Sequence, residues 1–259
     1  AGASGTGRTT RPRAVLSGGG AQARDITAQG IPLPQPTAYP AAMIVELGHF
    51  ALILAACIAL VQATVPLIGA HRNWTGWMAT AVPAATLQFL LVAVSFAALT
   101  YAFVTSDFSL KLVVENSHTL KPMLYKVSGV WGNHEGSMLL WVLILSAFGA
   151  ACAVFGSNLP ERLRARVLAV QAMTGVAFYA FILLTSNPFL RLAQPPFDGQ
   201  DLNPLLQDPG LAFHPPFLYL GYVGLSMSFS FAVAALIEGR DDAAWPRWVP
   251  PGALAAWMF

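Results

Sequence analysis

From residue 43 onward the chain alternates between long apolar runs and more polar connections. Five runs are long enough, or nearly long enough, to cross the ~30 Å hydrocarbon core of a bilayer as helices. They are Leu47–Ala70, Trp77–Val104, Ser137–Gly156, Val167–Thr185 and Pro216–Ile237. A sixth run begins near Val249 and continues to Phe259. The pattern predicts an all-α, polytopic membrane protein with five spans and the start of a sixth.

The composition also indicates a membrane protein. Hydrophobic residues make up 56% of the chain and charged residues 10%, against about 25% charged residues in soluble domains. The formal net charge is only +2, and no basic helix or basic stretch with interleaved aromatic residues occurs. A nucleic-acid partner is therefore not expected.

Residues 1–42 differ from the rest of the chain. They are rich in Gly, Ala, Arg, Thr and Pro and have no apolar periodicity, so we expect a disordered tail. The first residue is Ala, and Met43 directly precedes the first span. We therefore expect that 1–42 is not native coding sequence and that 43–259 is the N-terminal part of a longer membrane domain.

The basic residues of the connections predict the topology. The first, third and fifth connections are short and carry six Lys or Arg residues, whereas the second and fourth are about three times as long and carry four. Because Lys and Arg are enriched on the cytoplasmic side, the two long connections are predicted to lie outside. In a bacterium this is the periplasmic side of the inner membrane, and the N-terminus before the first span would share it.

The fourth connection ends in Phe213-His214-Pro215-Pro216. Adjacent prolines can open a helix because their missing N–H groups would be unpaired there anyway. The fifth span is thus predicted to begin at Pro216, with His214 at its outer mouth. The positive helix end disfavours an imidazolium, and a neutral imidazole binds metals. Taken alone, however, a loop histidine is more often a solvated or capping side chain, and no second histidine lies nearby to form a zinc site.

The second connection ends in Trp131-Gly-Asn-His-Glu-Gly-Ser137. Asn133 or Ser137 could cap the third span, and Trp131 fits an interfacial aromatic belt. The alternative is that Trp131 offers a flat apolar surface to a cofactor. A metalloprotease helix is excluded, because Met138 stands where the second histidine of that motif would be.

Three segments resemble the CcmF family, the membrane haem-lyase components of bacterial c-type cytochrome maturation. They are residues 131–141, 185–189 and 201–216. The paralogous NrfE proteins, which serve nitrite-reductase cytochromes, are similar. The resemblance extends from about Met43 to Phe259, and the segment 201–216 is its longest and most specific part.

This resemblance implies a site for haem, which is the cargo. His214 falls on the first of two periplasmic histidines that ligate the haem in the family, and Trp131 and Phe213 are candidates to pack against it. The tryptophan-rich segment, the second periplasmic histidine and the two histidines that hold a stable haem b would follow position 259. The implied partners are haem, apocytochrome c with a Cys-x-x-Cys-His motif, other maturation proteins including the haem chaperone, and membrane lipid.

The residues by themselves also leave two other classes open, a transporter or channel subunit and a structural scaffold. The main polar side chains deep in the spans are Gln62, Gln88 and Gln171. No Asp, Lys or Arg occurs there, although ion-coupled transporters usually carry such residues or broken helices near the bilayer midplane. This inventory argues against the transporter. We assign no catalytic residue and describe the chain as a haem-lyase-like component.

Overall fold

The computed structural model of the chain describes residues 39–239 and 249–259. In this part every regular element is a helix, and a single isolated bridge pairs Leu110 with Arg191. The long helices are α1 (Tyr39–Arg72), α3 (Ala81–Val104), α6 (His134–Phe155), α7 (Glu161–Thr185), α8 (Pro209–Gly224) and α9 (Ser226–Glu238). The short ones are α2 (Thr75–Met78), α4 (Lys111–Asn116), α5 (Met123–Ser128), η1 (Pro204–Leu206) and α10 (Val249–Trp257).

The five predicted spans are confirmed. Among the described residues, five helical segments are long and apolar enough to cross a membrane: Met43–Arg72, Thr75–Val104, His134–Phe155, Glu161–Thr185 and Ala212–Glu238. The last segment comprises α8 and α9. At the predicted start of a sixth span lies α10, which packs against α8 and α9.

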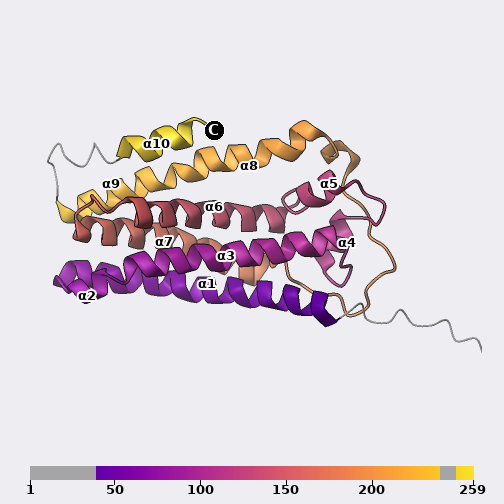
Figure 1. The fold of residues 1–259 in the computed structure, drawn as a ribbon, viewed down its shortest axis with the longest axis horizontal. Coiled ribbons are helices and arrows are strands. Elements are labelled where there is room, and N and C mark those ends of the chain that lie inside the picture. The colour runs from indigo at the N-terminus through magenta and orange to yellow at the C-terminus, as the bar shows by residue number, and fades with distance from the viewer. Residues whose placement is uncertain (1–38, 240–248) are drawn as a thin grey trace, which may run out of the picture. The chain divides into compact units, whose positions relative to one another are not determined.

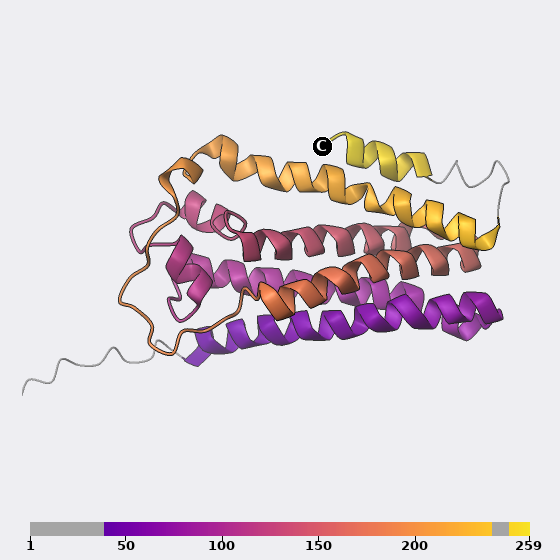
Figure 2. The same ribbon diagram turned by 180° about the vertical axis from the view of Figure 1, so that it is seen from behind.

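The spans from residue 39 to 239 form an antiparallel bundle (Figures 1 and 2). Helix α1 packs against α3 and α7, α6 packs against α3 and α7, and α8 and α9 cover α6 and α7. The main apolar core lies among the first four of these helices and includes Leu52, Leu99, Leu139 and Ile182. Consecutive spans run in opposite directions because each connection, short or long, joins two spans at the same end of the bundle.

The three glutamines within the spans link helices rather than line a polar path. Their hydrogen bonds, 2.8 to 3.0 Å long, join Gln62 to the Leu168 carbonyl, Gln88 to the Tyr179 hydroxyl, and Gln171 to the hydroxyls of Ser226 and Ser230. Each of these four bonds includes a residue of α7. Such bonds hold membrane helices together where the hydrophobic effect between them is weak. Helix α7 is therefore the centre of the polar contacts in the bundle.

Two boundaries differ from the sequence prediction. Helix α8 begins at Pro209, and Pro215 and Pro216 lie inside it, so the prediction that these prolines open the span was wrong. The turn before it, at Asp208, already starts the helix, since the Ala212 N–H bonds the Asp208 carbonyl at 2.9 Å. Helix α1 includes residues 39–42, which the sequence placed in the tail. The remainder of that tail lies outside the described residues.

Candidate functional site

The two long connections lie together at one end of the bundle and are joined to each other (Figure 1). Their backbones pair through bonds of 2.7 to 2.9 Å: Lys111 N–H to the Leu190 carbonyl, Leu192 N–H to the Ser109 carbonyl, and Gln200 N–H to the Val114 carbonyl. We call this structure, residues 105–133 with 186–208, the cap. These bonds fix the loop that leads into α8.

Side chains reinforce the cap. The Asp198 carboxylate accepts hydrogen bonds from the backbone and hydroxyl of Thr119, both at 3.0 Å, and lies 3.2 Å from His118 Nε2. Desolvation opposes ionisation of Asp198, but the bonds from Gly199 and Thr119 and the neighbouring His118 together lower its pKa. The carboxylate is thus held in the charged form that its donors require.

Lys121 is a second anchor of the cap. Its ammonium donates to the Asn116 carbonyl at 2.7 Å and lies 3.8 Å from Asp201. Burial lowers the pKa of Lys121 to about 8, and Lys126 adds to this effect, while Asp201 opposes it. At neutral pH the side chain remains mostly charged, so it serves as a structural donor.

The entry to α6 is a tight turn closed by Asn133. The Asn133 side-chain oxygen accepts from the Gly136 N–H at 2.7 Å, and its amide donates to the Gly129 carbonyl, also at 2.7 Å. Asn133 and Ser137 were the two residues predicted to cap the N-terminus of this helix, and the prediction is confirmed for Asn133. The Ser137 hydroxyl instead donates to the His134 carbonyl at 3.1 Å.

Trp131 fastens this turn to α8. Its indole Nε1–H donates to the Ala212 carbonyl at 2.8 Å, and its ring stacks on Phe96 with centroids 6.5 Å apart. In an uninterrupted helix the Ala212 carbonyl would accept from the N–H of residue 216, but Pro216 has none. Trp131 therefore supplies the donor that the proline removes.

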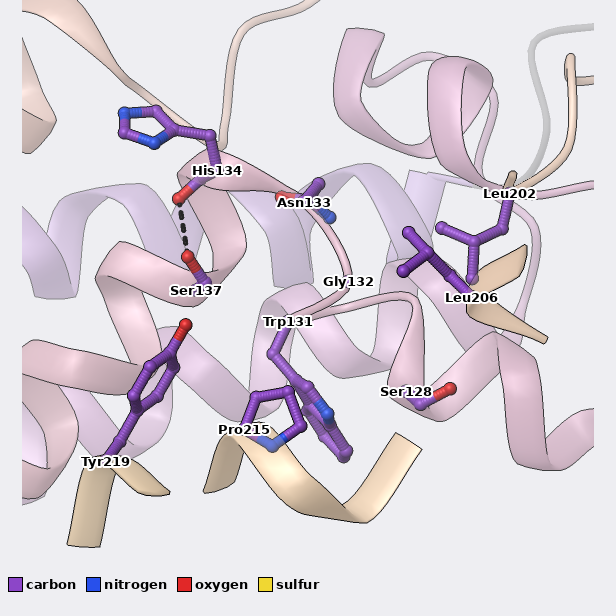
Figure 3. Close-up of a pocket in the computed structure, with 10 residues that line it drawn as sticks. All are labelled: Ser128, Trp131, Gly132, Asn133, His134, Ser137, Leu202, Leu206, Pro215 and Tyr219. Carbon is purple, nitrogen blue, oxygen red and sulfur yellow. Dashed lines mark hydrogen bonds between the residues drawn. The ribbon is translucent and has the colours of Figure 1, made fainter. Parts of the chain in front are cut away.

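A cavity of about 370 Å³ opens beside this contact. It is lined by Ser128, Trp131, Gly132, Asn133, His134, Ser137, Leu202, Leu206, Pro215 and Tyr219. Figure 3 shows the indole of Trp131 next to the ring of Pro215, with the Tyr219 phenol on the α8 side. The volume is within the usual range for small-molecule pockets, about 300–1,000 Å³. The cavity thus lies between the cap, the start of α6 and the first turns of α8.

His214 does not line this cavity. It lies in the second turn of α8, and its side chain is exposed, as is Phe213, at 54%. Phe217 and Leu218, three and four residues further on, share its helix face and are about half exposed. Phe217 also stacks on Phe259, with ring centroids 6.2 Å apart. His214 therefore stands at the cap end of a partly exposed apolar face of α8.

The other histidines near the cap are engaged. His49 lies 3.1 Å from the Asn187 amide and stacks on Phe189, His118 pairs with Asp198, and His134 lies 3.1 Å from the Ser186 hydroxyl. Across the part of the chain that the structure describes, no residue hydrogen-bonds the His214 ring, and no group of three or more His, Cys, Asp or Glu residues could hold a metal ion. Among the described histidines near the cap, His214 is therefore the one whose ring has no hydrogen-bonding partner.

The structure places the three candidate residues, Trp131, Phe213 and His214, at the cap end of α8, but only Trp131 lines the cavity. Trp131 donates a structural hydrogen bond and also lines the cavity, whereas Phe213 is exposed and does not line it. Tyr219, Leu202 and Leu206 were missed. A signal for the Trp131 contact exists in the sequence, because a proline four residues after Ala212 removes a helix donor, but it becomes visible only once α8 is known to start at Pro209.

The fold and the site define a polytopic helical membrane protein whose two long connections build a cap over the start of one span. The profile of the family described as cytochrome C assembly protein matches residues 131–259. The cytochrome c-type biogenesis protein Ccl1 of Rhodobacter capsulatus is 78% identical over 217 residues, which are 84% of this chain and 33% of the relative. CcmF of Escherichia coli is 49% identical over 218 residues, 84% of this chain and 34% of the relative.

A solved structure, "Cytochrome c Heme Lyase CcmF", superimposes with a TM-score of 0.73 at 28% identity, covering 83% of this chain and 34% of that one. The chain belongs to the CcmF family of cytochrome c-type biogenesis proteins. It spans about one third of the length of the curated relatives it matches.

Proposed function

We propose that this segment takes part in cytochrome c maturation by presenting His214 as an axial ligand to haem that is to be attached to apocytochrome c. Among the histidines near the cap, only His214 has an exposed ring without a hydrogen-bonding partner in the described residues. A neutral imidazole with an open nitrogen is a common haem ligand. This observation carries the proposal.

The surroundings of His214 suit a flat apolar ligand. Phe213, Phe217 and Leu218 are 54%, 50% and 45% exposed, so they offer an apolar surface beside the imidazole. The Trp131 bond to Ala212 fixes the turn of α8 that carries His214. The chain thus holds the ligand on a rigid backbone, as a positioning site requires.

In the proposed reaction the haem supplies the reactive vinyl groups. Each cysteine thiol of a Cys-x-x-Cys-His target adds across one vinyl double bond: sulfur bonds to one vinyl carbon, and a hydrogen ends on the other. No oxidant is needed for this addition. The role of His214 is to fix the orientation of the haem so that its vinyl edge faces the thiols. Haem and apocytochrome c are thus the proposed cargo and acceptor, with the haem chaperone as the proposed donor.

Haem binding in the full-length protein tests the proposal. We expect the Soret absorbance per protein of the purified, haem-loaded protein to fall on His214→Ala, and only in part, because the family resemblance places a stable haem b elsewhere. His118→Ala is the matched control, since it removes another cap histidine that already has a partner, Asp198. Equal Soret absorbance in His214→Ala and wild type would reject the ligand assignment.

We further propose that the cap faces the periplasm. The opposite end of the bundle carries Arg72, Arg162, Arg164 and Arg166, as expected for the cytoplasmic side. In a Cys57→Ala, Cys152→Ala background, a membrane-impermeant maleimide should label Leu120→Cys in intact cells and Ser157→Cys only after lysis. Leu120 is 86% exposed in the cap, and Ser157 is exposed between α6 and α7. The reverse labelling pattern would contradict this orientation and the site with it.

A further inference from the structure

The end of the bundle opposite the cap contains two adjoining cavities that share one residue, Arg166. The larger, of about 510 Å³, is lined by Leu67, Ile68, His71, Arg72, Arg166 and Ile237. The smaller, of about 300 Å³, is lined by Pro160, Arg162, Arg166 and Glu238. Both lie where α1 ends, α7 begins and α9 ends, so their polar walls stand at the ends of three spans.

Arg166 is buried with most of its donors unused. Only 3% of the residue is exposed. Its Nη2 is 3.5 Å from the Ala70 carbonyl, the outer limit of a hydrogen bond. Nη1 lies 3.2 Å from a Glu238 carboxylate oxygen, yet neither Nη1 nor Nε has a hydrogen-bond partner in the described residues. Because a guanidinium has five N–H donors and leaving them unsatisfied in a buried site is costly, Arg166 is suited to an acceptor in the cavity that it lines.

The charge of the lining favours an anion. Among the described residues, three guanidinium groups, those of Arg72, Arg162 and Arg166, line the two cavities together with a single carboxylate, that of Glu238. The Arg162 Nε is occupied by the Ala70 carbonyl at 3.0 Å, whereas Arg72 is exposed at the rim. The planar fork of arginine matches the oxygens of a phosphate group in two parallel bonds. The chemistry of the site is therefore that of a phosphate binder.

Leu67, Ile68 and Ile237 in the lining of the larger cavity are apolar, which indicates that the phosphate belongs to a ligand with acyl chains. Ile68 and Ile237 are 44% and 50% exposed, and Leu67 and Ile68 precede Arg72 by about one helical turn. The apolar residues thus lie on the membrane side of the basic ones. Basic pockets between spans at the end that faces a charged leaflet bind lipid headgroups in this way. We propose that this site, Arg72 and Arg166 with the groove of Leu67, Ile68 and Ile237, binds the phosphate and one acyl chain of an anionic phospholipid.

The test measures thermal unfolding of the full-length protein purified in a neutral detergent. Dioleoyl phosphatidylglycerol at saturating concentration should raise the midpoint by roughly 5 °C, and phosphatidylcholine or inorganic phosphate should raise it much less. Arg72→Gln and Arg166→Lys should each lose at least half of the shift. Arg166→Lys retains the charge that faces Glu238 but not the guanidinium fork, and Arg72→Gln changes an exposed side chain, so both are expected to fold.

Arg164→Gln is the matched control, because it removes one positive charge from the same connection without changing the lining of either cavity. It should keep the full shift. A shift of the same size with phosphatidylcholine, or an equal loss of the shift in Arg164→Gln and Arg72→Gln, would overturn the site. A full shift with inorganic phosphate alone would overturn the lipid as its occupant. If both Arg72→Gln and Arg166→Lys keep the full shift with phosphatidylglycerol, the assignment of the site to these two arginines is overturned.

Discussion

His214→Ala in the full-length protein should reduce holocytochrome c formation by roughly tenfold to a hundredfold, as expected when a group that positions the reacting edge is lost. A loss of activity in this variant would not reflect a folding defect, because the exposed imidazole has no hydrogen-bonding partner in the described residues that the substitution would leave unpaired. Alanine also favours the helical conformation that residue 214 adopts in α8. Protein level and membrane insertion should therefore be unchanged. The measurement is haem-stained c-type cytochrome in a strain that lacks the native gene.

Three companion variants separate iron ligation from a role in folding. His214→Gly with added imidazole should recover part of the activity, since a free ligand can occupy the vacated iron position. Trp131→Phe should lower activity less than His214→Ala does, because it keeps the ring against Phe96 but loses the bond to the Ala212 carbonyl. If His214→Asn matures cytochromes at the wild-type rate, the ligand assignment fails, because an exposed surface residue is expected to tolerate that change.

Gly136→Ala should cost the largest amount of stability of any single methyl addition near the site. An added Cβ would overlap the Val130 carbonyl oxygen, an atom of the backbone in the turn that enters α6. The turn cannot move away freely, because the Asn133 amide bonds the Gly129 carbonyl on one side and its oxygen bonds the Gly136 N–H on the other. Overpacking of this kind costs about 3 kcal/mol or more.

Gly76→Ala is the control, because nothing lies within 4 Å of its added Cβ and alanine suits a helix better than glycine. We expect Gly136→Ala to yield little folded protein by size-exclusion chromatography after a short heat challenge, while Gly76→Ala matches or exceeds wild type. Equal heat resistance of the two variants would mean that the turn at Val130 can open without a loss of stability, which would contradict the close packing of the cap. It would also weaken the case that Trp131 is held rigidly.

Features that depend on local chemistry could be predicted from the sequence. Hydropathy alone determined the five spans and their approximate limits, because each span must be apolar over its own length. The N-terminal capping of α6 by Asn133 was also predictable, because it is a local contact: the side-chain oxygen accepts from an N–H only three residues away. The motif resemblance identified the family and made His214 the candidate haem ligand.

Only the tertiary structure determined how these pieces meet. The bond from Trp131 to the Ala212 carbonyl joins residues 81 positions apart, and the contact of Arg166 with the Ala70 carbonyl joins residues 96 positions apart. Helix α8 could start at Pro209 and continue through Pro216 because a distant indole supplies the donor that this proline lacks. A pattern along the chain records the preference of each segment, but whether a proline ends a helix depends on which distant group can satisfy the carbonyl it leaves unpaired.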